Sequence, residues 1–307
     1  MIGRYAFLFL VGIALQLMMG NVDASFLTYP WTICLVVNYL YLQILMYFYA
    51  DKYNWIKTLY DRPAYLSSLF TLLVLTLFFG LIPQNGSTEG VWGMLGFTKM
   101  SSSWIFVLFL LHFITVLGMK VIEDVHHWRK RKIPVVLMHV ACYVILLSSI
   151  LSSGEKIRIR VTTALNVPVS IGVTETGKMF ELPFTLMLKK FVLEEYPPQI
   201  HLIDGKEQVI PRREVKKFVS IVAVTDENGT KEVEIMVNHP VRIGDWRIYQ
   251  SGYDSARGKQ STISILECVQ DSWYPIIHVA MWIILVAGVL MMFGRWTSRR
   301  QKKEEKA

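Results

Sequence analysis

Charged residues are scarce in this chain: of 307 residues, 18% are Asp, Glu, Lys or Arg, whereas 53% are hydrophobic. Soluble globular domains carry about 25% charged residues, so this composition indicates a membrane protein. Apolar runs of about 20 residues are long enough to cross a hydrocarbon core of ~30 Å. Six such runs predict spanning helices at about 5–21, 31–50, 64–84, 102–121, 133–152 and 274–294.

Cysteine is also rare, with three residues, and none belongs to a CxxC, a CxxCH or a metal-ligand spacing. We therefore expect small hydrophobic side chains and one free thiol rather than a redox or zinc centre. The sequence also lacks a Gly-rich phosphate loop, paired carboxylates and a serine with a plausible base. No catalytic residue is predicted from the sequence.

The net charge of +8 follows the membrane topology. The cations cluster in four places: at Arg4, between the second and third runs, between the fourth and fifth runs, and in the tail. By the positive-inside rule, these segments and both termini are cytoplasmic. Residues 153–272 hold 16 basic and 16 acidic side chains, counted along the sequence, and are predicted to lie outside. We expect no nucleic-acid partner.

The predicted fold is an integral membrane α-helical bundle of about six transmembrane helices with an inserted all-β extracytoplasmic domain. Residues 1–152 form a five-helix region, 153–272 the β-rich domain of roughly seven to nine strands, and 273–307 the final helix and basic tail. The clearest hairpin turns at Asn228-Gly229, a pair favoured where both central residues need positive φ. The first run, interrupted by Gln16, is expected to be a helix; the alternative is a cleaved signal peptide ending near 22–24.

Three histidines, His112, His139 and His278, fall within predicted spans, where an ionisable side chain usually has a function. Counted from the nearest cations at 1.5 Å per residue, His139 lies roughly 10 Å deep and His112 roughly 12 Å deep. Neutral imidazole is an axial ligand for haem iron, and the cations Arg129, Arg131 and Lys132 could contact the haem propionates. The alternative is a hydrogen bond between helices without a ligand.

Three aromatic residues near the end of the β-rich segment, Trp246, Tyr249 and Tyr253, allow two interpretations. They could belong to the domain core, which we favour, or form a face that docks a partner.

Four stretches in order resemble the ResB (CcsB) family of system II cytochrome c biogenesis. They are TLFFGLIPQ at 76–84, MSSSWIFVLFLLHFITVLGMK at 100–120, KIPVVLMHVACYVILLSSILSSGEKIRIR at 132–160 and VNHPVRIGDWRIYQSGYD at 237–254. The last is similar to a V-N-x-P-x-x-x-G-x-x-[IY]-Y-Q pattern. The resemblance covers about 64–295.

The resemblance implies a haem-handling subunit of a cytochrome c synthase in the bacterial cytoplasmic membrane. It carries the role of transient haem b ligand over to His139, and it implies a CcsA-like membrane partner that supplies the second axial ligand. It also implies apocytochrome c and a thioredoxin-like thiol reductant as partners. His112 is not implied by the resemblance, and its matched depth is a separate geometric hypothesis.

The chain departs from the family pattern in two apolar runs before 64 and in a short outer domain, and it contains no WGxxWxWD segment. Two alternatives therefore stand beside the haem-delivery interpretation. One is an electron-transfer subunit with a resident b-type haem between His112 and His139. The other is an assembly scaffold that binds no haem.

Overall fold

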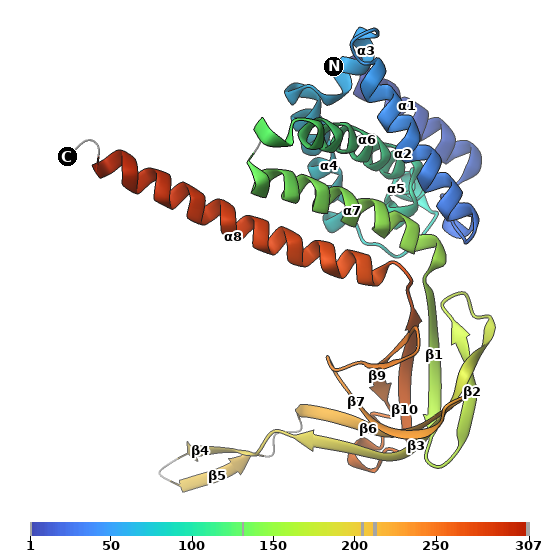
Figure 1. Ribbon diagram of the computed structural model, residues 1–307. Helices are drawn as coiled ribbons and strands as arrows, with labels where there is room; N and C mark the ends of the chain where they lie inside the picture. Colours follow the sequence, from blue (N-terminus) through green and yellow to red (C-terminus); the bar gives the residue numbers. More distant parts are fainter. Residues whose placement is uncertain (1, 131, 204–205, 211–213, 305–307) are drawn as a thin grey trace. The chain divides into compact units, whose positions relative to one another are not determined.

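The structure, a computed structural model, describes residues 2–130, 132–203, 206–210 and 214–304 (Figure 1). It divides into a helical unit, Met1–Glu155 with Trp273–Ala307, and a β-rich unit, Lys156–Ser272. The helices are α1 (Ile2–Met19), α2 (Trp31–Tyr49), α3 (Asn54–Tyr60), α4 (Arg62–Leu81), α5 (Gly90–Met94), α6 (Trp104–His126), α7 (Ile133–Glu155) and α8 (Tyr274–Glu304).

Five helices are long and apolar enough to cross a membrane: α2, α4, α6, α7 and the Tyr274–Phe293 part of α8. They confirm five of the six predicted spans. The remaining run forms α1, whose apolar stretch Gly3–Met19 is shorter than the others. The fold class is confirmed as a bundle of apolar helices with an inserted all-β unit.

Helix α6 lies at the centre of the helical unit, in contact with α1, α2, α3, α4 and α7. Its buried side chains, among them Phe109, Phe113, Ile114 and Leu117, point in several directions around the helix. A helix that is apolar on all sides is one that other protein segments surround. The other spans are arranged around α6, and α8 lies along α7.

Helix α1 packs on α6 through a small residue and a polar one. Gly12 lies so close to Ile105 that a Cβ at this position would be 2.9 Å from the Ile105 Cα. Gln16 is buried, and its Oε1 accepts a hydrogen bond of 3.0 Å from the backbone N–H of Trp104. Trp104 is the first residue of α6, so the amide of Gln16 satisfies one of the unpaired donors at that helix end.

Polar side chains also attach α2 to the centre of the bundle. The hydroxyl of Tyr143, on α7, donates to Oε1 of Gln43, which is buried, over 2.7 Å. One turn earlier on α2, the hydroxyls of Tyr39 and Thr115 are 2.8 Å apart. Such hydrogen bonds between helices are a common means of association in an apolar surrounding.

The β-rich unit has ten strands: β1 (Ile157–Ala164), β2 (Pro168–Thr174), β3 (Met179–Glu195), β4 (Gln199–Ile203), β5 (Lys206–Ile210), β6 (Val215–Asp226), β7 (Gly229–Met236), β8 (Val241–Ile243), β9 (Trp246–Tyr253) and β10 (Ile263–Gln270). Eight form one antiparallel sheet in the order β7-β6-β3-β2-β1-β10-β9-β8, and β4 pairs with β5 in a separate hairpin. The described unit thus has ten strands where seven to nine were predicted, and the difference is the separate β4–β5 hairpin outside the eight-stranded sheet.

The main sheet is nearly closed into a barrel. Its two edge strands, β7 and β8, follow one another in the chain, and Met236 bridges to His239 in the short connection between them. The core lies inside the curved sheet, because side chains of a strand alternate between its faces. On β3, for example, Leu182, Phe184, Leu186 and Leu188 are all buried.

The predicted hairpin is present as β6–β7, but its turn differs by one residue. Asp226 pairs with Gly229, so Glu227 and Asn228 form the turn. Among the described residues other than glycine, only Asn166 and Asn238 have positive φ, whereas Gly229 has φ of 114°. The Asp226 carboxylate accepts a hydrogen bond of 2.8 Å from the Asn228 N–H, a local contact that favours this turn.

Candidate functional site in the helical unit

His139 lies in the first two turns of α7 and contacts a carboxylate of α6. Its ring Nδ1 is 2.7 Å from Oδ2 of Asp124. The Asp124 side chain is 2% exposed, whereas that of His139 is 18% exposed. A buried carboxylate in an apolar helix is costly unless it is paired, and the imidazole is one of its partners.

The contact with Asp124 determines which ring nitrogen of His139 is available. A carboxylate oxygen accepts hydrogen bonds, so the proton in this contact belongs to Nδ1. In the neutral ring, Nε2 then carries the lone pair. Nε2 makes no hydrogen bond to any residue that the structure describes. His139 thus offers a nitrogen donor on a partly exposed ring edge.

Lys120 and Glu123 complete the polar cluster at this end of α6. The Lys120 ammonium is 3.4 Å from Oδ1 of Asp124 and also pairs with Glu123. Glu123 and Asp124 follow Lys120 by three and four residues, spacings that place both carboxylates next to the Lys120 side chain on the helix. The positive charge of Lys120 therefore offsets part of the free-energy cost of burying the Asp124 carboxylate.

An aromatic ring packs against the imidazole. The ring of Tyr65, on α4, meets that of His139 at 5.9 Å between centroids with an interplanar angle of 62°. Phe113 lies beside Tyr65 at 6.2 Å. The surroundings of His139 thus combine one nitrogen donor with a neighbouring aromatic ring.

Within the described residues, no group of three or more His, Cys, Asp or Glu side chains could hold a bare metal ion. Haem iron needs only one axial donor from a given protein segment. A single imidazole nitrogen, such as that of His139, is a donor of this kind.

The predicted propionate contacts begin just beyond α6. Arg129 is exposed and lies over the Trp128 ring at 5.8 Å, and Lys132 is exposed immediately before α7. Arg131 lies outside the described residues. Lys132 and His139 are seven positions apart, or about 10 Å along a helix.

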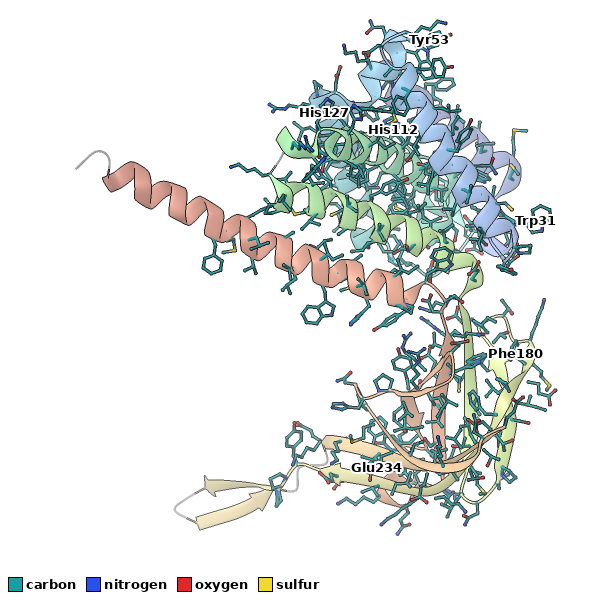
Figure 2. All side chains as sticks on the ribbon, viewed as in Figure 1. Trp31, Tyr53, His112, His127, Phe180 and Glu234 are labelled. Atoms are coloured by element: carbon teal, nitrogen blue, oxygen red, sulfur yellow. The ribbon has the colours of Figure 1, made fainter. Side chains whose placement is uncertain are left out.

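The structure does not bring His112 to His139. His139 contacts Asp124, which follows His112 on α6 by twelve residues (124 − 112) and therefore lies about 18 Å further along the helix. The depth count from Lys120 was misleading because α6 continues past this cation to His126. Figure 2 labels His112 on α6 and His127 just beyond its C-terminal end.

His112 faces α1 instead. Its ring meets that of Tyr5 edge-on at 5.6 Å between centroids. Its Nε2 is buried and has no hydrogen-bond partner in the described part of the chain.

The aromatic residues of the β-rich unit separate into two groups. Trp246 is 5% exposed and packs against Phe180 and Phe184 in the core, so it does not form a docking surface. Tyr249 is half-buried, and Tyr253 packs against Phe191 and Phe218 at 5.2 Å and 4.9 Å. The core interpretation, which we favoured, holds for Trp246.

Sequence reasoning missed Asp124, which pairs with the proposed ligand. The span was predicted to end at 121, so Glu123 and Asp124 were assigned to the cytoplasmic connection. The available signal was their spacing from Lys120, since ion pairs three and four residues apart are typical of a continuing helix.

Together, the apolar spans and the inserted β unit define a multi-pass membrane protein, in which His139 pairs with a buried carboxylate. The sequence profile of the ResB-like family matches residues 129–280, about half of the chain, including α7, the β-rich unit and the start of α8. The chain belongs to the ResB-like family, whose members act in cytochrome c biogenesis.

Similarity to other known proteins is weak. No curated protein matches the chain significantly. Among solved structures, the cytochrome c haem lyase CcmF is similar at 10% sequence identity and a TM-score of 0.31. The match covers 71% of this chain and 33% of CcmF, so the chain spans about a third of that protein's length. At this TM-score the similarity supports no structural argument.

Proposed function

We propose that this chain is the haem-handling subunit of a cytochrome c synthase and that His139 is an axial ligand to haem b in transit. The observation that carries the proposal is the placement of His139 on α7, where its partly exposed imidazole lies with Nδ1 2.7 Å from Oδ2 of the buried Asp124. Family membership supports the general context of haem handling. Haem b is the cargo here, held through its iron while it crosses the membrane.

In the proposed path, reduced haem b enters from the cytoplasmic side. Its propionates contact Arg129, Arg131 and Lys132, and its iron binds His139. The protein belongs in the bacterial cytoplasmic membrane, with both termini inside and the β-rich unit outside. A CcsA-like membrane protein supplies the second axial ligand, because the described residues place no other imidazole beside His139.

The proposal assigns haem attachment to the partner. Attachment adds the two thiols of a CxxCH motif in apocytochrome c across haem vinyl groups, with each sulfur forming a bond to carbon and each thiol hydrogen moving to the vinyl group. The thiols have to be reduced beforehand, and a thioredoxin-like protein is the expected reductant. The β-rich unit would dock apocytochrome c or brace the partner.

The resident b-type haem between His112 and His139 is the less favoured alternative. One iron cannot bind two imidazoles that lie about 18 Å apart along the bundle. A haem-free scaffold is the remaining alternative, and it predicts that each histidine in the spans tolerates substitution.

The test is the haem content of the detergent-purified protein, measured by pyridine haemochrome, with and without a CcsA-like partner. His139→Ala should lower copurifying haem b on the order of tenfold or more and abolish mature cytochrome c. His112→Ala is the control, because this histidine faces α1. Equal losses of haem in the two variants would favour the electron-transfer subunit with a resident haem. If no sample contained haem, the haem-free scaffold would be the remaining interpretation.

A further inference from the structure

We propose that Asp124 is the positioning residue of the haem site: it fixes the tautomer and orientation of His139 and strengthens its bond to iron. This inference rests on the proposed function of His139. It assigns a role to a residue of α6, outside the matched family segment that begins at residue 129.

The geometry singles out this carboxylate. Asp124 is buried, its Oδ2 is 2.7 Å from Nδ1 of His139, and its Oδ1 faces the Lys120 ammonium at 3.4 Å. The ring therefore has a hydrogen bond on the nitrogen opposite the donor. Metal-binding histidines commonly donate their second N–H to a carboxylate, which fixes the ring and raises its basicity.

The other histidines of the helical unit lack this arrangement. Nε2 of His278 already accepts a hydrogen bond of 3.1 Å from the indole of Trp282. Nδ1 of His127 contacts a backbone carbonyl, that of Glu123. Among the histidines of the helical unit, all of which the structure describes, His139 is the only one with a carboxylate within ion-pair distance.

The physical consequence concerns the iron. A carboxylate that accepts the Nδ1 proton increases electron density on Nε2 and favours ferric over ferrous iron. Lys120 moderates this effect because it competes for the same carboxylate. Weakening the Asp124 contact should therefore raise the midpoint potential of bound haem, and abolishing the contact should also weaken haem binding.

The experiment compares Asp124→Asn, Asp124→Ala and Glu89→Gln in the full chain copurified with its CcsA-like partner. Glu89→Gln is the control, since this exposed carboxylate lies before α5 and outside the Lys120–Glu123–Asp124 cluster. We expect an upward shift in midpoint potential in Asp124→Asn. In Asp124→Ala we expect the same shift together with about tenfold or greater loss of haem, and in Glu89→Gln neither effect.

A second readout needs no haem. In protein labelled with ¹⁵N-histidine and purified haem-free, nitrogen chemical shifts report which ring nitrogen of His139 is protonated, with His139→Gln used for assignment. We expect a proton on Nδ1 in the wild type and a mixture of tautomers in Asp124→Ala. Size-exclusion profiles check that each variant is folded. If the Asp124→Ala variant does not fold, the nearly isosteric Asp124→Asn variant still tests the role of Asp124.

The outcomes separate the two proposals. An unchanged potential in Asp124→Asn, or a wild-type ring without a proton on Nδ1, would overturn the role of Asp124 while leaving His139 as the ligand. Haem retained by His139→Ala would overturn the proposed function. The nitrogen shifts would still decide whether Asp124 sets the state of the ring.

Discussion

At the scale of single residues, Cys268 shows how burial determines chemistry. It lies on β10 and is fully buried in the core of the β-rich unit. Burial raises the pKa of its thiol from 9.0 to about 12, with a further contribution from the neighbouring Glu267. Since the thiolate is the reactive form, this cysteine behaves as a small hydrophobic residue.

We expect Cys268 to be unreactive towards maleimides in the folded protein. A pKa about three units higher reduces the thiolate fraction at neutral pH about a thousandfold, before any steric exclusion is considered. The measurement is the labelling rate at pH 7 in a Cys34→Ser, Cys142→Ser background, before and after denaturation. Thr176→Cys, at an exposed turn, is the reactive control. Labelling of folded Cys268 as fast as this control would contradict the prediction.

The candidate site was predictable in part at this scale. His139 stands out in the sequence because an imidazole is unusual within an apolar run. Asp124 does not, because a carboxylate near a helix end is ordinary until its burial is known. Asp124 was missed because its partner, His139, lies on another helix. Contacts between two helices depend on how the helices pack, and the spacing of residues within one helix does not reveal them.

At the scale of elements, the crossing of α1 and α6 depends on a glycine. Only a residue without a side chain allows the approach of Gly12 to the Ile105 backbone. Small residues at such crossings let helix backbones come close in membranes. Gly3, on the same helix, provides a contrast, because a Cβ added there would meet no atom within 4 Å.

Gly12→Ala should destabilise the protein by about 1–3 kcal/mol, because the added methyl group meets backbone atoms that cannot move aside. Gly3→Ala should be neutral or slightly stabilising, since alanine favours helix. The measurement is thermal unfolding in detergent for both variants. Equal unfolding midpoints for Gly12→Ala and Gly3→Ala would contradict the prediction, because they would show that a methyl group between α1 and α6 does not lower the stability.

Element types were more predictable than their ends. Hydropathy identified the long helices, and alternation identified the β-rich segment. The end of α6 was misplaced because Lys120, Glu123 and Asp124 read as a polar boundary, whereas their mutual pairing lets the helix continue. The β6–β7 turn lies one residue earlier than predicted. The Asp226 side chain stabilises this turn through a hydrogen bond, which the preference for an Asn-Gly pair in hairpins does not reveal.

At the scale of the whole molecule, the distribution of cations predicts the orientation in the membrane. Arg4, Lys52, Lys57 and the cluster from Arg129 to Lys132 lie at ends or connections that alternate along the helices. The β-rich unit has balanced charge and follows α7. By the positive-inside rule it is predicted to lie outside the cytoplasmic membrane.

Fusions to alkaline phosphatase, which is active only outside the cytoplasm, check this orientation. A fusion at Asn228, in the β6–β7 turn, should be active, and one at His127, after α6, should be inactive. A cytoplasmic reporter such as green fluorescent protein at the same two positions is the reciprocal control. The reverse pattern would invert the whole molecule and place His139 near the outer surface.

The capping of α6 by Gln16 has a consequence for how the chain is made. The Gln16 amide and its donor partner, the N–H of Trp104, are 88 residues apart. At about 5–20 residues per second, ribosomes need roughly 4–18 s to synthesise that interval. During this time, the Gln16 amide has no α6 to bind. The first helix therefore reaches its final position only after α6 has been synthesised, which makes its early placement provisional.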